Sequence, residues 1–135
     1  MRPFYFYLIF FVVHYISMRF KKTILRNGLR VITAPLKDSP TITALVLVET
    51  GSKYETKNLN GLSHFLEHMC FKGTTNRPTA IDITKELDGL GAQSNAFTSQ
   101  EFTGYWAKAQ AGNLEQILDI VSDIYINPLF DSTEI

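Results

Sequence analysis

Apolar and polar side chains alternate over residues 61–73 with the period of an α-helix. On a wheel of about 100° per residue, His64, Glu67 and His68 fall within one sector about 100° wide. The stretch contains no proline, Asn60 is a candidate N-cap, and the final glycine can end the helix in a left-handed turn. The opposite side of the wheel is apolar and carries Leu62, Phe65, Leu66, Met69 and Cys70. The pattern therefore predicts a short amphipathic helix that turns two imidazoles and a carboxylate away from its apolar face.

The segments before this helix favour β-structure. Asn27-Gly28 is typical of a type I′ hairpin turn, here between strands expected at 23–26 and 29–34. Residues 41–50 are rich in β-branched side chains and almost wholly apolar in the middle. That composition predicts a central strand buried on both faces of a sheet.

After the first helix the pattern predicts a second helix, a strand pair and a third helix. Thr79 is a candidate N-cap for a helix over 80–90, and a strand pair is expected at 93–98 and 102–109. The last helix starts near Asn113, and Asn127-Pro128 ends it. With four or five strands and three helices, we expect an α+β fold: a two-layer arrangement of a mixed sheet with helices packed against it.

Composition limits the number of domains and the classes of partner. The chain has 135 residues, of which 45% are hydrophobic, and 13 basic side chains balance 13 acidic ones. This is enough for one hydrophobic core, and the zero net charge gives no support for nucleic-acid binding. Cys70 is the single cysteine, so it has no internal disulfide partner, and its place near the apolar side predicts a packed thiol.

Residues 1–17 form an apolar N-terminal segment with two interpretations. The apolar run is shorter than the roughly 20 residues that span a bilayer, but it has the length of a signal-peptide core, with Arg2 before it. In that case the protein is exported or membrane-anchored. Alternatively, translation starts at Met18, residues 1–17 are an over-called start, and the protein is cytoplasmic. Both interpretations stay open, and a membrane partner is expected only under the first.

The three polar side chains of the first helix suit zinc chemistry. Two imidazoles at positions i and i+4 can both reach one Zn²⁺, and an adjacent carboxylate can take a proton from a water whose pKa zinc has lowered. In sequence these residues form the motif HxxEH, from His64 to His68, in which the order of the HExxH motif is reversed. The spacing alone leaves open that the histidines are solvated side chains that bind no metal.

The identities of the residues along this helix carry more information than the HxxEH spacing alone. Residues 61–74 closely resemble the inverzincin metallopeptidases of peptidase family M16, which include pitrilysin, insulysin and mitochondrial processing peptidase. The resemblance extends over 18–135, with further motifs at 27–31, 91–101 and 127–130. It implies a zinc-dependent metalloendopeptidase that cleaves extended peptides, and it places the present chain in the N-terminal part of the family's N-terminal domain.

The resemblance also implies roles for individual residues. It implies that His64 and His68 bind zinc, that Glu67 is the general base which activates a zinc-bound water, and that Asn95 and Ala96 hold the peptide on an edge strand. Asn95 has a second interpretation, as a turn or strand-end residue without a ligand.

The family's third zinc ligand, a glutamate on a later helix, is expected beyond Ile135, because Glu134 comes too early to match it. The chain therefore looks like a partial domain, truncated at the C-terminus, and we expect it to hydrolyse peptides negligibly on its own. Expected partners are a peptide substrate and either the missing C-terminal half or a homologous subunit. Two other functions remain open: a non-catalytic subunit or scaffold of the same family, and a metal-binding or metal-sensing module.

Overall fold

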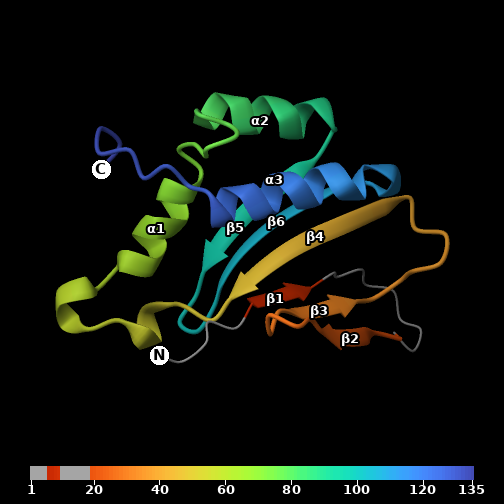
Figure 1. The fold of residues 1–135 in the computed structure, drawn as a ribbon, viewed down its shortest axis with the longest axis horizontal. Helices are drawn as coiled ribbons and strands as arrows, with labels where there is room; N and C mark the ends of the chain where they lie inside the picture. The colour runs from red at the N-terminus through yellow and green to blue at the C-terminus, as the bar shows by residue number, and fades with distance from the viewer. Residues whose placement is uncertain (1–5, 10–18) are drawn as a thin grey trace.

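The computed structural model describes residues 6–9 and 19–135. A six-stranded sheet has the strand order β2-β3-β1-β4-β6-β5, and helices α2 and α3 run alongside the part of it formed by β4, β6 and β5 (Figure 1). The strands are β1 (Phe6–Ile9), β2 (Lys21–Ile24), β3 (Arg30–Thr33), β4 (Thr41–Val48), β5 (Gln93–Thr98) and β6 (Thr103–Gln110). The helices are α1 (Leu62–Cys70), α2 (Ala80–Gly89) and α3 (Leu114–Ile126), with short 3₁₀ turns η1 (Ser52–Tyr54), η2 (Lys57–Leu59) and η3 (Ala111–Asn113). The predicted α+β architecture is confirmed.

Strand β4 is the centre of the sheet, as its composition predicts. It pairs antiparallel with β6 along its whole length, from Thr41 opposite Gln110 to Val48 opposite Thr103. The consecutive residues 44–46 are all buried. Because successive side chains in a strand point to opposite faces, this run shows that both faces of β4 are covered.

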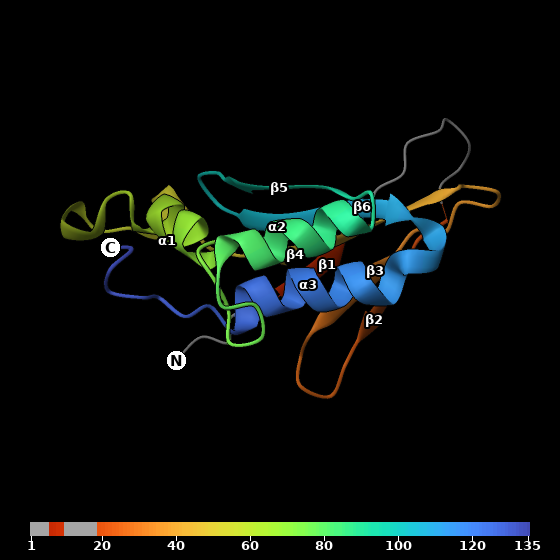
Figure 2. The same ribbon diagram turned by 90° about the horizontal axis from the view of Figure 1, so that it is seen from above.

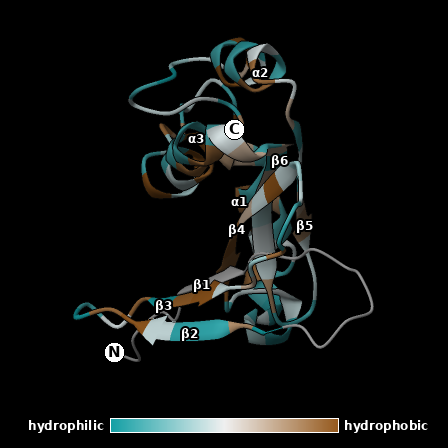
Figure 3. Ribbon diagram, turned by 90° about the vertical axis from the view of Figure 1, so that its right-hand side faces the viewer, coloured by the Kyte–Doolittle hydropathy of each residue, from teal (hydrophilic) through white to brown (hydrophobic). Residues whose placement is uncertain are grey.

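The main core lies between this part of the sheet and α3. Figure 2 shows α2 and α3 side by side over the strands, and in Figure 3 α3 lies beside the part of the sheet formed by β4 and β6. Helix α3 buries Ile117, Ile120, Val121 and Ile124. Ala44 and Ala107, which are opposite one another on β4 and β6, are both 0% exposed. Burying an isoleucine side chain stabilises a fold by about 1.5–3 kcal/mol, so this helix–sheet contact is a large part of the stability.

The hairpin between β2 and β3 differs from the predicted turn. A type I′ turn needs a positive φ at both central residues, but only Gly28, with φ of 86°, has one. The backbone N–H of Leu25 donates to the carbonyl of Leu29, and that of Gly28 donates to the carbonyl of Leu25. The loop is therefore a three-residue turn that ends in a left-handed glycine, and the type I′ prediction is wrong.

Strand β1 belongs to the segment 1–17, for which the hydrophobic pattern predicted no strand. Its backbone pairs parallel with β3 and antiparallel with β4. The remainder of that segment lies outside the described residues, so the choice between a signal or anchor and an over-called start stays untested. None of the helices in the described ranges is long and apolar enough to cross a membrane.

Candidate metal centre and active site

Helix α1 carries the predicted site residues, and its N-terminus is capped differently from the prediction. The helix starts at Leu62, with Gly61 as the N-cap at φ of 90°, and not at Asn60. The carboxylate of Glu55 accepts hydrogen bonds from the backbone N–H groups of Gly61 (2.7 Å) and Ser63 (2.8 Å). The hydrogen bond from Ser63 has the larger effect, and together with that from Gly61 it lowers the pKa of Glu55 below its ordinary value. An acidic side chain from outside the helix thus satisfies its first donors.

The C-terminal end of α1 also differs from the expected left-handed glycine turn. The helix ends at Cys70, and the backbone N–H of Phe71 donates to the carbonyl of His68. Gly73 has φ of 150°, outside the left-handed helical region, and a Cβ there would clash with the backbone of Pro78. Glycine is needed at this position because two stretches of backbone approach closely, and not because it ends the helix.

A buried polar cluster fixes the loop that follows α1. Arg77, 7% exposed, donates to Asp123 (2.8 Å) and Asp119 (2.7 Å) on α3 and to Glu86 (2.9 Å) on α2. The hydroxyl of Thr74, which is fully buried, donates to Asp123 at 2.6 Å. This cluster ties the chain immediately after the candidate site to two helices of the core.

Ionisation of Asp123 is part of the cluster. Burial works against the charge of this carboxylate, which is 3% exposed. Hydrogen bonds from Thr74, Asn127 and Arg77 outweigh burial and hold the pKa of Asp123 below its usual value. The group is therefore charged in the folded protein at neutral pH.

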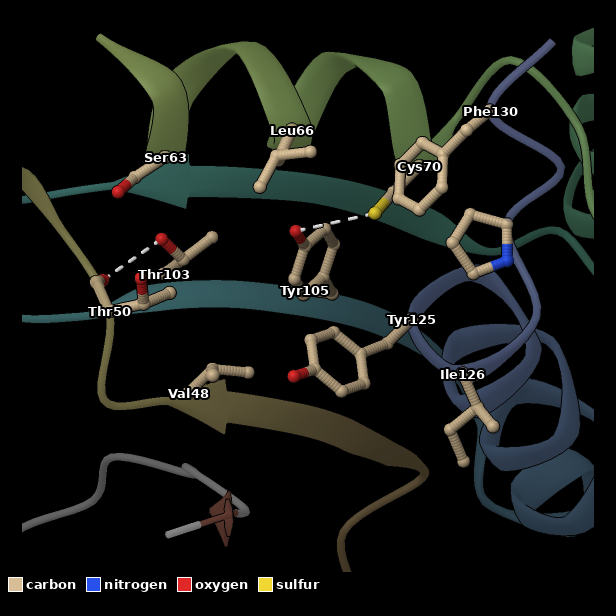
Figure 4. Close-up of a pocket in the computed structure, with 11 residues that line it drawn as sticks. Val48, Thr50, Ser63, Leu66, Cys70, Thr103, Tyr105, Tyr125, Ile126 and Phe130 are labelled. Atoms are coloured by element: carbon tan, nitrogen blue, oxygen red, sulfur yellow. Dashed lines mark hydrogen bonds between the residues drawn. The ribbon is translucent and has the colours of Figure 1, made fainter. Parts of the chain in front are cut away.

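The underside of α1 faces a cavity of about 550 Å³. Figure 4 shows Ser63, Leu66 and Cys70 pointing from the helix toward β6, where the hydroxyl of Tyr105 donates to the sulfur of Cys70 at 3.6 Å. Burial raises the pKa of the Cys70 thiol, which is 4% exposed, so the predicted packed thiol is confirmed. The predicted apolar face is only partly covered, because Leu62 and Leu66 are each 38% exposed.

The candidate metal ligands lie outside this cavity. His64 and His68 are exposed, and their Nε2 atoms are 3.0 Å apart. Glu67, between them on the helix, is half-buried and accepts a hydrogen bond at Oε2 from the hydroxyl of Thr98 on β5. None of the three helix residues lines the cavity. The structure thus brings the two imidazoles together on the outer side of α1, with the carboxylate directed toward β5.

The two imidazoles fit part of a zinc site. Two nitrogen ligands on a tetrahedral zinc ion stand about 3.3 Å apart, close to the 3.0 Å between the Nε2 atoms of His64 and His68. Within residues 6–9 and 19–135, no group of three His, Cys, Asp or Glu side chains is arranged to hold a metal ion. The described residues therefore offer two imidazole nitrogens at a spacing that suits one metal ion, with no third ligand among them.

Asn95 and Ala96 lie on β5, at the edge of the sheet. Asn95 is exposed, and its side-chain oxygen accepts a hydrogen bond from the backbone N–H of Ala96 at 2.8 Å. In the part of the chain that the structure describes, neither residue is hydrogen-bonded to His64, Glu67 or His68. They come shortly before Thr98 on the same strand, so the strand that reaches the carboxylate of Glu67 is the one predicted to hold the peptide.

Sequence comparison identifies the family. The model of the family described as "Insulinase (Peptidase family M16)" matches residues 30–135. The chain belongs to peptidase family M16. A crystal structure of a protease from Helicobacter pylori has the same fold, with a TM-score of 0.81 and 32% sequence identity over 87% of this chain and 28% of that one.

Two curated relatives of this chain carry peptidase names, whereas another, subunit 1 of the cytochrome b-c1 complex of Rattus norvegicus, does not. An uncharacterized zinc protease of Bacillus subtilis, YmxG, is 39% identical over 85% of this chain and 28% of its own length. The β subunit of the mitochondrial processing peptidase of Dictyostelium discoideum is 43% identical over 87% of this chain and 25% of its own length. The M16 chain described here therefore spans about a quarter of the length of these relatives. What the comparisons show is membership of a peptidase family, and the first of these two relatives is named as a zinc protease.

Proposed function

We propose that the protein containing this chain is a zinc-dependent metalloendopeptidase in which His64 and His68 are zinc ligands and Glu67 is the general base. The observation that carries the proposal is the pair of Nε2 atoms 3.0 Å apart on α1, with a carboxylate one residue before the second histidine. The third ligand is a residue beyond Ile135. The relatives named as zinc proteases support zinc as the metal.

The residues of this chain have separate roles in hydrolysis. His64 and His68 would hold zinc through Nε2, the two atoms that lie 3.0 Å apart on α1. Zinc, when bound, supplies a Lewis acid that makes water acidic enough to react at neutral pH. Glu67 takes the proton of the attacking water and then delivers it to the leaving amine as the peptide bond breaks.

The substrate is an extended peptide bound to the edge of the sheet. Among the described strands, β5 pairs with β6 on one side only, so its other edge offers backbone groups to a further strand. Asn95 and Ala96 lie in the middle of β5, where a peptide paired by β-augmentation passes. The hydrogen bond from the Ala96 N–H to the Asn95 side chain must open if that N–H is to pair with a peptide.

A second unit closes over the substrate: either the C-terminal half of the same protein or a homologous subunit. This proposal is supported by the length of the relatives and by the fact that one of them is named as a subunit of a processing peptidase. Helix α1 leaves Leu62, Phe65 and Leu66 38–41% exposed, which is apolar surface that such a unit can cover.

The test of the base is Glu67→Gln in the complete protein. Glutamine keeps the shape of the side chain but cannot take a proton, so kcat for a peptide is expected to fall by about 10²–10⁴ or more. Zinc content, measured by atomic absorption, is expected to stay unchanged. The matched control is Glu115→Gln on the exposed first turn of α3, which should cleave like the wild type.

Wild-type rates in Glu67→Gln would show that another group is the base. A complete wild-type protein that binds no zinc and cleaves no peptide would instead favour the non-catalytic subunit of the same family.

A further inference from the structure

One polar contact in the site joins α1 to a different element. The hydroxyl of Thr98, the last residue of β5, donates to Oε2 of Glu67, although the two residues are 31 positions apart in the sequence. In the described residues, Oε1 of Glu67 has no hydrogen-bond partner. The two oxygens of the carboxylate are therefore in different situations: one is held by the sheet, and the other is free.

Thr98 is a well-anchored donor. It pairs with Thr103 at the first position of β6, and Thr103, 1% exposed, donates its own hydroxyl to the backbone carbonyl of Thr50 at 3.1 Å. Threonine is branched at Cβ and its χ1 torsion is stiff, so a fixed backbone fixes the hydroxyl. The contact is partly buried, which reduces competition from water.

Glu67 needs such an anchor. A glutamate side chain has several rotatable torsions and loses considerable conformational freedom when it is held in one geometry. A general base must be within hydrogen-bond reach of the proton that it takes. A carboxylate on a half-exposed helix face samples other rotamers unless a second group holds it.

We infer that Thr98 is the positioning residue of the base: its hydroxyl holds Oε2 of Glu67 so that Oε1 is presented to the attacking water. The inference rests on the proposed function of Glu67. It gives the end of β5 a role in the reaction as well as in the binding of peptide. Because the effect runs through orientation, it acts on the chemical step and leaves substrate binding largely as it is.

The test is steady-state kinetics of the complete, zinc-loaded protein with Thr98→Val and Thr98→Ser. Valine keeps the branched shape and removes the hydroxyl, whereas serine keeps the hydroxyl. For Thr98→Val we expect kcat to fall about 10- to 100-fold, the scale of loss from a misplaced catalytic group, with KM within about twofold of the wild type. Thr98→Ser should stay within about threefold of wild-type kcat.

Control variants separate positioning from a general disturbance. Thr23→Val, on exposed β2 at the opposite edge of the sheet, should leave kcat unchanged. Zinc content and Tm of Thr98→Val should match the wild type, and adding Thr98→Val to Glu67→Gln should cause no further loss. If Thr98→Val does not fold, Thr98→Ala takes its place in the same comparison with serine.

The outcomes also separate this inference from the proposed function. Wild-type kcat in Thr98→Val, or an equal loss in Thr98→Val and Thr98→Ser, would overturn the positioning role while Glu67 remains the base. An unaltered rate in Glu67→Gln would overturn the proposed function itself.

Discussion

Arg77 and Asp123 show how single residues hold the loop behind the candidate site. Both side chains are nearly inaccessible, with 8% and 3% exposure, and their charged atoms are 2.8 Å apart. Removing one member of a buried ion pair leaves the other desolvated and unpaired, which is strongly destabilising. Removing the charge of one partner therefore tests how much the pair contributes to stability.

We predict that Asp123→Asn lowers the free energy of unfolding by about 3 kcal/mol at neutral pH. This value is at the lower end of the range for a buried ion pair because Arg77 keeps Asp119 and Glu86 as partners. Urea denaturation measures the loss. Glu101→Gln, which removes a charge from the exposed Lys53–Glu101 pair, should cost far less.

The same variant has a defined pH dependence. The pKa of Asp123 is lower in the folded protein than in the unfolded chain, so its charge stabilises the fold fully above the unfolded value of about 3.9. This contribution is lost as the pH falls through the lower, folded value. The difference between wild type and Asp123→Asn should thus be constant near pH 7 and shrink below about pH 4. A difference that stayed constant into strong acid would contradict this account.

At the scale of elements, the two helices α1 and α2 begin in different ways. The N-terminus of α2 is closed by a capping box: the Thr79 side chain accepts from the Asp82 N–H, and the Asp82 carboxylate accepts from the Thr79 N–H. Because this motif lies within four consecutive residues, the sequence was enough to predict Thr79 as the cap. Helix α1 is capped by Glu55, which reaches across the intervening turn η2, and no local pattern indicates such a contact.

We predict that Thr79→Ala lowers the free energy of unfolding by about 1 kcal/mol, through loss of the cap of α2. Thr79→Ser should retain most of the stability. Thr84→Ala is the matched control, since Thr84 lies inside α2 and its hydroxyl donates to the carbonyl of Ala80. Alanine favours a helix interior, so this second threonine can be removed without loss. Equal destabilisation by the two alanine variants in urea denaturation would count against the capping role.

At the scale of the whole molecule, patterns within single segments were sufficient to predict the α+β layering, the three helices and the buried central strand. Features that depend on contacts between segments distant in the sequence could not be predicted in this way. The place of β1 between β3 and β4 is set by backbone pairing that its apolar composition does not specify. The contact from Thr98 to Glu67 likewise requires knowing that α1 lies beside the end of β5.

In the candidate site, too, the features that lie within one segment were predictable, and those that depend on other segments or on bound molecules were not. The HxxEH spacing predicted that His64 and His68 share a helix face, and the structure places their Nε2 atoms 3.0 Å apart. The role of Glu67 as base and the metal itself stay predictions. So do the roles of Asn95 and Ala96, which depend on a peptide strand that only a complex can show.

The most direct test of the metal centre is anomalous diffraction at the zinc absorption edge from crystals of the complete protein. The account predicts one zinc peak in contact with Nε2 of both His64 and His68, beside Glu67, with a third protein ligand from beyond Ile135. A peak bound to other residues, or zinc-saturated crystals with no peak between the two imidazoles, would contradict it.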